Sequence, residues 1–539
     1  MAQIRYFDAG CSLGRHLLLP DDHPQTAERL VAEMNHFGIH DALVIDTLAN
    51  TTDPMAGNVR ILERTADHPR LHPAWVGLGT PSHEMPPPAE LVSHMRESGV
   101  GALFLFYQQF DTRLEPWAVD DLLAELQKAR VPLFLSAKGA LNQSGKTDWN
   151  NVVRICGQFP ELPVIVTEYR IYGDQRALYG ALAASPNLKV DLSALWLHKR
   201  IEFICCTFGA DRLVWASQMP ERTPASPLMQ LNYSDISDHE LALIAGDTMR
   251  NLLSWNPHIR FAGDVEFSQP VDALHKAARE RVSLRNEEFY DCHGHIGWCS
   301  NRHVVHDEPG DIIAEMDKFG IRACCVFSFA GAMPDEEFGN NRAVEMRRAY
   351  PDRFIGFTLV NPAHGEDAML AELHRGLELG MQGVKLAVSF QGYPLDGPLI
   401  DVVCRFAHDH RQFILNHAWG PEEHMHRLCM TYPDACFFTG HATTAYGELA
   451  REVDNLYICT CPLLGWGRTE QFVELYGADR ILFGSDLMDL PIAWGLGPIL
   501  YARIPEADKR LILGENLLRL MDRYDIHPPR SSAAIHRQK

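Results

Sequence analysis

The 539-residue sequence lacks any long apolar run. No stretch approaches the roughly 18 apolar residues that a membrane-spanning helix requires, and the start, MAQIRYFDAG, has no basic region followed by an apolar one. Basic residues are also scarce, since 49 Lys and Arg stand against 70 Asp and Glu, for a formal net charge of −21. Nucleic acid and anionic membranes would repel such a chain. We therefore expect a cytoplasmic protein that binds a small-molecule substrate and neither nucleic acid nor a membrane. A homodimer is an open alternative to a monomer.

The sequence also lacks the cysteine pattern of a disulfide framework. Its 13 cysteines are odd in number and several lie inside apolar runs, so we expect reduced thiols in the core. Cys459 and Cys461 form a Cys-x-Cys pair in YICTCP, and alternation along a strand places both side chains on one face. No second cysteine pair stands nearby to complete a zinc site, so no metal site is expected at this pair.

What the sequence does contain is one pattern written twice. YFDAGCSLGR, from Tyr6, and YDCHGHIGWC, from Tyr290, align on a shared aromatic residue and Asp, and FGADRLVWAS, from Phe208, matches YGADRILFGS, from Tyr476. Each half has eight short β-type runs separated by segments with helical periodicity. The runs begin at Arg5, Asp41, Leu71, Gly101, Pro132, Pro163, Leu188 and Arg212, and again at Phe289, Ala323, Arg353, Gly383, Phe413, Cys436, Leu456 and Arg480.

Eight strands alternating with helices over about 240 residues indicate a (β/α)8 barrel. We therefore expect an α/β protein made of two tandem TIM-barrel domains that arose by duplication. The first is predicted over residues 1–262 and the second over 289–524. Residues 263–288 are expected to form a linker, and 525–539, which have almost nothing to bury, a flexible tail.

Polar side chains stand at the ends of five of the eight expected strands in the second half. They are His293, His295, Lys385, His417, His441 and Asp486. Because this fold places catalytic groups at the carboxyl-terminal ends of its strands, these side chains should converge on one mouth. Alternation lets His293 and His295 reach the same ion, and imidazoles with one carboxylate suit a divalent metal. We expect one ion, Zn²⁺, with manganese or iron as alternatives.

This set resembles the amidohydrolase superfamily and, more closely, its amidohydrolase-2 (amidohydrolase-related) branch. The segments DCHGHIG, GVKL followed by FQGYPLDGP, ILNHAWG, FFTGH and DRILFGSDL look like segments of that branch in the same order. The resemblance implies the metal ligands His293, His295, His417 and Asp486. It also implies proton transfer by Asp486 and His441, with Lys385 facing the substrate. In binuclear members a carboxylated lysine bridges two metals instead, but we expect one metal here.

The resemblance favours a metal-dependent hydrolase that cleaves an amide, lactone or ester bond of a small substrate, cyclic or carboxylated, by means of activated water. One alternative is a metal-dependent non-oxidative decarboxylase of an unsaturated or aromatic carboxylic acid, and a second is a metal-binding scaffold without catalysis. Arginine at the mouth would suit a substrate carboxylate. The expected substrate-binding residues are Trp298, Arg302, Gln391, Tyr393, Trp419 and Arg468.

The first half keeps the strands but none of the ligands. The alignment places Gly10, Ser12, Phe104, Ala137, Glu168 and Gln218 where the second half has its four histidines, lysine and aspartate. We therefore expect a degenerate, non-catalytic barrel. The best candidates for a residual pocket in it are Glu168, Tyr169 and Arg170.

Overall fold

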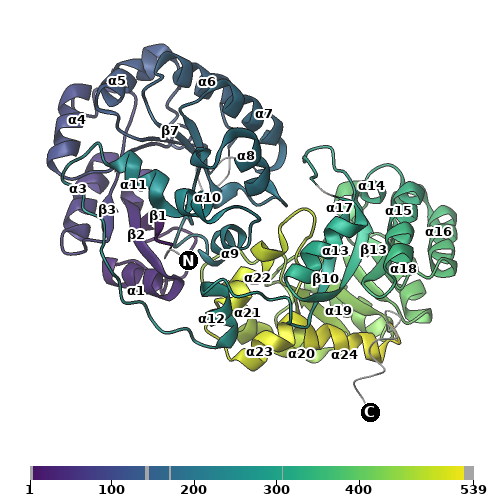
Figure 1. The fold of residues 1–539 in the computed structure, drawn as a ribbon. Coiled ribbons are helices and arrows are strands. Elements are labelled where there is room, and N and C mark those ends of the chain that lie inside the picture. The colour runs from purple at the N-terminus through teal and green to yellow at the C-terminus, as the bar shows by residue number, and fades with distance from the viewer. Residues whose placement is uncertain (1–3, 140–144, 169–170, 306, 527–539) are drawn as a thin grey trace. The chain divides into compact units, whose positions relative to one another are not determined.

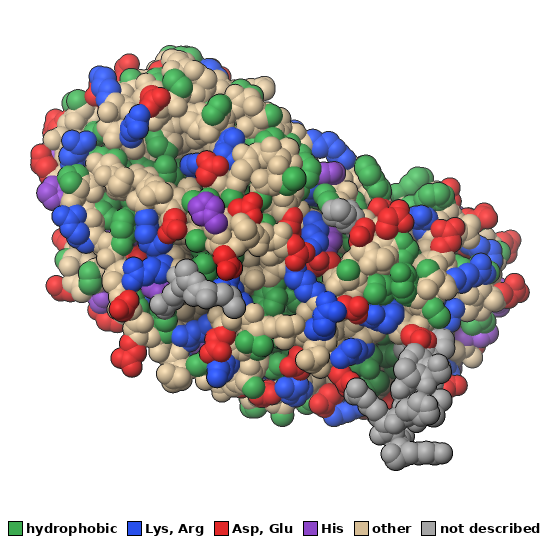
Figure 2. Space-filling view, viewed as in Figure 1, with side chains coloured by type: hydrophobic (Ala, Val, Ile, Leu, Met, Phe, Trp, Pro, Cys, Tyr) green, Lys and Arg blue, Asp and Glu red, His purple; other side chains and the backbone are tan. Residues whose placement is uncertain are grey.

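The computed structural model describes residues 4–139, 145–168, 171–305 and 307–526. The chain divides into two compact units, Met1–Pro270 (unit 1) and Val271–Lys539 (unit 2) (Figure 1). Tyr169, Arg170 and all but the first two residues of the expected tail lie outside the described residues. Among the helices described, none has both the length and the apolar character needed to cross a bilayer. On the face drawn in Figure 2, acidic and basic side chains are interleaved and form no patch of one sign.

Unit 2 is built on eight parallel strands that pair in chain order. They are β10 (Phe289–Ile296), β11 (Ile321–Ser328), β12 (Phe354–Val360), β13 (Gly383–Leu386), β14 (Phe413–Asn416), β15 (Cys436–Thr439), β16 (Leu456–Cys459) and β17 (Ile481–Leu482). The Cys292 amide donates to the Phe483 carbonyl at 2.8 Å, so the first strand lies beside the last. The eight strands expected in this half are confirmed, and they form a nearly closed parallel barrel.

Helices surround these strands (Figure 1). They are α12 (Ala273–Arg279), α13 (Pro309–Lys318), α14 (Phe329–Ala332), α15 (Glu336–Ala349), α16 (Glu366–Glu378), α17 (Val388–Gln391), α18 (Leu399–Asp409), α19 (Glu422–Thr431), α20 (Leu449–Glu452), α21 (Arg468–Tyr476), α22 (Ile492–Leu500), α23 (Glu506–Arg510) and α24 (Asn516–Arg523). Helix α13 buries Ile312 and Met316, four residues apart, and the chain leaves it through Gly320 at φ 69°, a conformation that suits glycine. Helix α12 lies in the expected linker and buries Leu274 and Ala278 within unit 2.

Unit 1 contains parallel strands at all eight expected positions, but they form two sheets. The three-stranded sheet holds β1 (Tyr6–Leu13), β2 (Ile39–Asp46) and β3 (Leu71–Pro73), and the six-stranded sheet holds β4 (Trp75–Val76), β5 (Leu103–Leu105), β6 (Leu133–Ser136), β7 (Val164–Thr167), β8 (Leu188–Asp191) and β9 (Leu213–Val214). The single eight-stranded sheet predicted for this half is therefore not observed. The expected third strand is divided beside Pro73, which has no N–H to donate to a ladder.

Eleven α-helices are described in unit 1. They are α1 (Ala27–Phe37), α2 (Thr47–Thr51), α3 (Pro54–Thr65), α4 (Pro88–Glu97), α5 (Pro116–Ala129), α6 (Trp149–Gln158), α7 (Ile171–Ala184), α8 (Arg200–Phe208), α9 (Ala225–Asn232), α10 (Asp238–Ala242) and α11 (Thr248–Leu253). All 13 cysteines of the chain are free, and only Cys206 is exposed, in agreement with the expected reduced thiols.

Candidate metal centre

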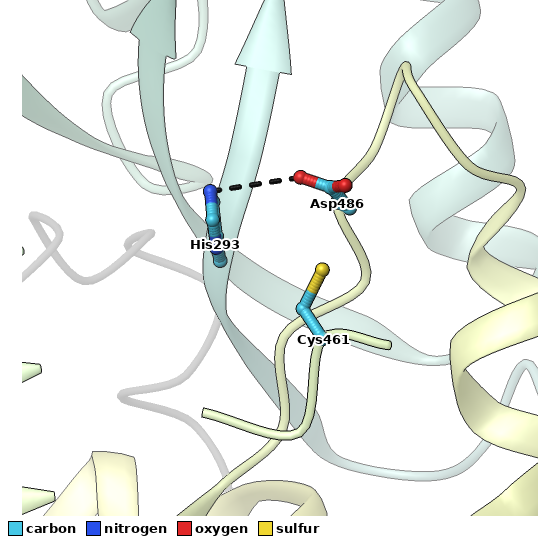
Figure 3. A group of neighbouring side chains, drawn as sticks. All are labelled: His293, Cys461 and Asp486. Atoms are coloured by element: carbon cyan, nitrogen blue, oxygen red, sulfur yellow. Dashed lines mark ion pairs between the residues drawn. The ribbon is translucent and has the colours of Figure 1, made fainter. Parts of the chain in front are cut away.

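Three buried side chains meet at the carboxyl-terminal ends of the strands of unit 2. His293 lies on β10, Cys461 follows β16, and Asp486 follows β17. One ligand atom from each lies within 4.8 Å of the other two, and Figure 3 shows the imidazole and the carboxylate facing each other with the thiol beside them. Their exposed fractions are 0%, 1% and 3%. Two of these residues were predicted as ligands, and Cys461 was not.

Asp486 is the centre of the cluster. Its Oδ1 atom lies 2.7 Å from His295 Nε2 and 3.6 Å from His293 Nε2. The backbone at Asp486 is tied to β10, because the Asp486 amide donates to the His293 carbonyl at 2.9 Å. The amide and hydroxyl of Ser485 both donate to the buried carboxylate of Asp291, which anchors the turn to the first strand.

The other predicted histidines lie next to this group. The rings of His417 and His441 have centroids 4.4 Å apart, and the ring of His441 is 5.8 Å from that of His293. His417 also packs against Phe390, with centroids 4.6 Å apart. The four histidines predicted from the sequence thus lie at one mouth, although only His293 is part of the compact three-residue group.

Burial sets the protonation states of these groups. It lowers the pKa of His295 to about 4 and that of His417 to about 3, and it holds the pKa of His293 well below its usual value. Burial alone would raise the pKa of Asp486, but its contacts with the surrounding histidines, the hydrogen bond with His295 among them, outweigh burial, and the pKa lies well below its usual range. Neutral imidazoles and an ionised carboxylate are the forms that bind metal.

Lys385 is buried beside the cluster with an exposed fraction of 2%. Its Nζ lies 4.2 Å from the centroid of the Phe327 ring and has no hydrogen-bond partner among the described residues. Burial lowers the pKa of Lys385 to about 7. The side chain is therefore a buried amine that can bind a proton or a substrate group near neutral pH.

The residues present fit a divalent ion. His293 Nε2 is fully buried and makes no hydrogen bond within the described part of the chain, although a buried polar atom normally has a partner. Imidazole nitrogens, a carboxylate and a thiol are donors that transition metals accept. The sequence does not single out Cys461, because no second cysteine pair accompanies it. The available signal was its position just beyond the seventh strand, at the end where the other ligands lie.

The residues predicted to bind substrate are in different surroundings. Trp298 is 63% exposed, and Gln391 has a buried Oε1 without a partner in the described chain. Arg302 pairs with Asp489 at 2.7 Å, and its guanidinium carbon lies 4.8 Å from the centroid of the Phe329 ring. That ring stacks on His295.

Three further predicted substrate residues are engaged with the protein itself. Trp419 is 1% exposed and donates from its indole nitrogen to the Phe438 carbonyl at 2.8 Å. The Tyr393 hydroxyl accepts from a backbone amide at 2.9 Å, and Arg468 donates to Gln471 at 2.5 Å. These contacts support local structure.

In unit 1 a network of protein charges lies beyond the ends of β6, β7 and β9. Lys138 Nζ lies 2.5 Å from Glu221 and 3.4 Å from Glu168, whose carboxylate also accepts from the Ser136 hydroxyl at 2.6 Å. Lys138 and Glu221 also line a cavity of about 630 Å³. No group of three His, Cys, Asp or Glu with ligand spacing occurs in the part of unit 1 that the structure describes.

Comparison with known proteins gives a family match for the second unit. Residues 290–523 match the family model described as Amidohydrolase (Amidohydro_2), which confirms the family resemblance over these residues. No curated protein matches the chain.

Several solved structures are similar to 44% of the chain. The 5-carboxyvanillate decarboxylase of Novosphingobium aromaticivorans, complexed with manganese and 4-hydroxy-3-methoxy-5-nitrobenzoic acid, is 15% identical, with a TM-score of 0.36, and 97% of it is covered. The 2,6-dihydroxybenzoate decarboxylase from Rhizobium is 18% identical, with a TM-score of 0.37 and 99% covered. An uncharacterized TIM-barrel protein from Bordetella bronchiseptica is 16% identical, with a TM-score of 0.36 and 100% covered.

Proposed function

We propose that unit 2 is a metal-dependent hydrolase that cleaves an amide, lactone or ester bond of a small substrate. One observation carries this proposal. His293 and His295 contact Asp486 at the mouth of a parallel barrel, and His417 and His441 lie beside them. Such a convergence of titratable groups with strongly perturbed pKa values is typical of functional sites. The family match over residues 290–523 supports it.

His293 and Asp486 would hold the ion, with His295 and His417 as the further ligands that the family resemblance implies. A divalent ion bound there polarises a carbonyl oxygen and lowers the pKa of a coordinated water. Asp486, ionised and buried, accepts the proton of the attacking water on its carboxylate. Burial lowers the pKa of His441, so its neutral ring can orient the water, or accept the proton from Asp486 and then pass it to the leaving group.

Lys385 would determine which substrates bind. Its amine has no hydrogen-bond partner among the described residues, and a substrate carboxylate would supply one. Aromatic rings surround the same space, since Phe327 lies under the lysine and Phe329 stacks on His295. These contacts favour a substrate that joins a flat apolar portion to a carboxylate.

The same observation favours a second candidate, a metal-dependent non-oxidative decarboxylase of an aromatic or unsaturated carboxylic acid. A carboxylate held beside aromatic rings suits either reaction, and the two differ in the bond that breaks. The test is to load the purified full chain with zinc or manganese and supply lactones, cyclic amides, esters and aromatic carboxylates. Release of acid without carbon dioxide supports the hydrolase, and release of carbon dioxide supports the decarboxylase. Metal binding without either reaction in the whole panel would favour a scaffold.

We also propose that unit 1 is a degenerate second barrel that arose by duplication of the same fold. In unit 1 the amide and hydroxyl of Ser217 donate to Asp8. In unit 2 those of Ser485 donate to Asp291 in the same way. Two further pairs of equivalent bonds are Trp215 N to Ile244 O with Phe483 N to Ile512 O, and Val76 N to Asn58 Oδ1 with Leu359 N to Asn340 Oδ1. Shared buried contacts of this kind support a common ancestor.

A further inference from the structure

We propose that Cys461 is itself a ligand of the divalent ion, which makes the centre a thiolate site that selects zinc, and that Cys459 positions His293 for it. This inference rests on the proposed function, because it concerns the same metal. It gives both cysteines of the YICTCP segment a role at the metal centre, beyond packing in the core. Only Cys461 would bind the ion directly; Cys459 would act through His293.

The position of Cys461 points to ligation. It is the second residue beyond β16, and its Sγ lies within 4.8 Å of a ring nitrogen of His293 and a carboxylate oxygen of Asp486. His293 Nε2 is fully buried and lacks a hydrogen-bond partner in the described residues, which is an independent sign that an absent group belongs there. The three donors come from the ends of three different strands and face one point (Figure 3).

The chemistry of the donor set sets the preference among metals. A thiolate is a soft ligand that favours zinc, whereas carboxylate and imidazole ligands alone also suit manganese. The thiol loses its proton to solvent when the ion binds, as cysteine ligands do. A centre with Cys461 should therefore hold zinc far more tightly than manganese, and a centre without it should lose much of that difference.

Cys459 lies behind the histidine. Its Sγ is 3.9 Å from His293 Nδ1, and the Cys292 thiol donates to the same sulfur at 3.7 Å. With the Nδ1 proton directed at this sulfur, the lone pair of Nε2 is left for the metal. Gly484 provides the room, because a Cβ atom there would lie 2.4 Å from Cys459 Sγ and 3.0 Å from His293 Cβ.

The experiment uses the full chain, stripped with a chelator and reloaded with cobalt(II). The wild type should bind cobalt and show a sulfur-to-cobalt charge-transfer band in the near ultraviolet. Cys461→Ser should bind cobalt without this band. Cys459→Ser should keep the band and bind every ion more weakly, by the roughly 10- to 100-fold that loss of an outer partner costs. Cys404→Ser, which removes a buried thiol on α18, is the matched control and should match the wild type.

A second readout uses zinc and manganese. X-ray absorption of the zinc-loaded wild type should detect one sulfur at about 2.3 Å. In Cys461→Ser the ratio of zinc to manganese affinity should fall by about ten-fold or more, whereas Cys459→Ser should lower both affinities alike. The wild-type spectra decide the matter even if a variant fails to fold.

Stoichiometric cobalt without the charge-transfer band, or zinc without a sulfur neighbour, would overturn the thiolate assignment and leave the proposed function intact. A band that disappears in Cys459→Ser and persists in Cys461→Ser would also overturn it. A chain that binds no divalent ion at all would refute the proposed function and this inference together.

Discussion

Replacing Lys385 with methionine should make the protein more stable and less active. The lysine ammonium is buried, makes no hydrogen bond in the described part of the chain, and has its pKa lowered by burial from 10.5 to about 7. Because the folded state disfavours the charged form, the protonated lysine costs stability at every pH below its unfolded pKa. Methionine fills a similar volume without a charge, so it removes this cost and also the cation that we propose meets the substrate.

The size of the effect follows from proton linkage. The folded pKa lies below the unfolded one, so the penalty of Lys385 is complete below pH 7 and disappears as the pH rises towards 10.5. The two pKa values give a gain for Lys385→Met on the order of 4 kcal/mol at pH 7 and about 2 kcal/mol at pH 9, as upper limits. The gain should therefore shrink by about half across this interval.

A second buried lysine of unit 2 gives the matched control. Lys509 has an exposed fraction of 0%, but its ammonium lies 2.6 Å from Asp272 and donates to the Leu500 carbonyl at 2.8 Å. Lys509→Met leaves a buried carboxylate without its partner and should destabilise the protein by about 3–5 kcal/mol. The assay is urea unfolding of the chelator-treated full chain at pH 7 and pH 9. Loss of stability in Lys385→Met, or a gain that does not change with pH, would refute the reasoning.

The remaining predictions concern the metal, the proton carrier and the packing around them. Elemental analysis of the chain supplemented with zinc or manganese should give one ion per chain, and two ions would contradict a single centre. Asp486→Asn should fold but lose about two to four powers of ten in turnover, and near-normal turnover would remove Asp486 from the mechanism. Gly484→Ala, with its Cβ 2.4 Å from Cys459 Sγ, should lower the free energy of unfolding by about 1–3 kcal/mol, as urea melts would measure. Lys138→Met should destabilise unit 1 by about 3 kcal/mol, because Glu168 and Glu221 lose the cation between them and Glu221 is left with His16; a change under about 1 kcal/mol would contradict the pairing.

Much of the architecture follows from the sequence, because the strands are short apolar runs that are buried at nearly every position. The run FILN of β14, for example, is buried throughout. The division of the third strand in unit 1 was not predicted. Proline in LHPAWV signals a missing donor, but only the folded chain shows that Ala74 bonds to Val44 and Trp75 bonds to Ala102, so that one segment serves two neighbours.

The site was predictable as far as strand ends define it. His293 and Asp486 meet because parallel strands present their carboxyl ends at one mouth, which the order of the strands fixes. The positions of loop residues follow no such rule, and the sequence did not predict that the indole of Trp419, a residue expected to contact substrate, donates to the Phe438 carbonyl. Cys461 escaped prediction for a related reason. Alternation shows that a cysteine faces inward, but not which side chains from other strands it meets.

The positions of unit 1 that align with the predicted ligands of unit 2 are taken up by contacts within the protein. A Cβ atom on Gly10 would lie 2.9 Å from Gln218 Nε2, so the amide occupies the space that a histidine side chain would need. That amide donates to the Thr167 hydroxyl at 3.0 Å, which ties the mouth together without a metal. Lys138 adds a fixed cation between Glu168 and Glu221. No single substitution should create a metal centre there, because Gln218 and this ion network would both have to be displaced.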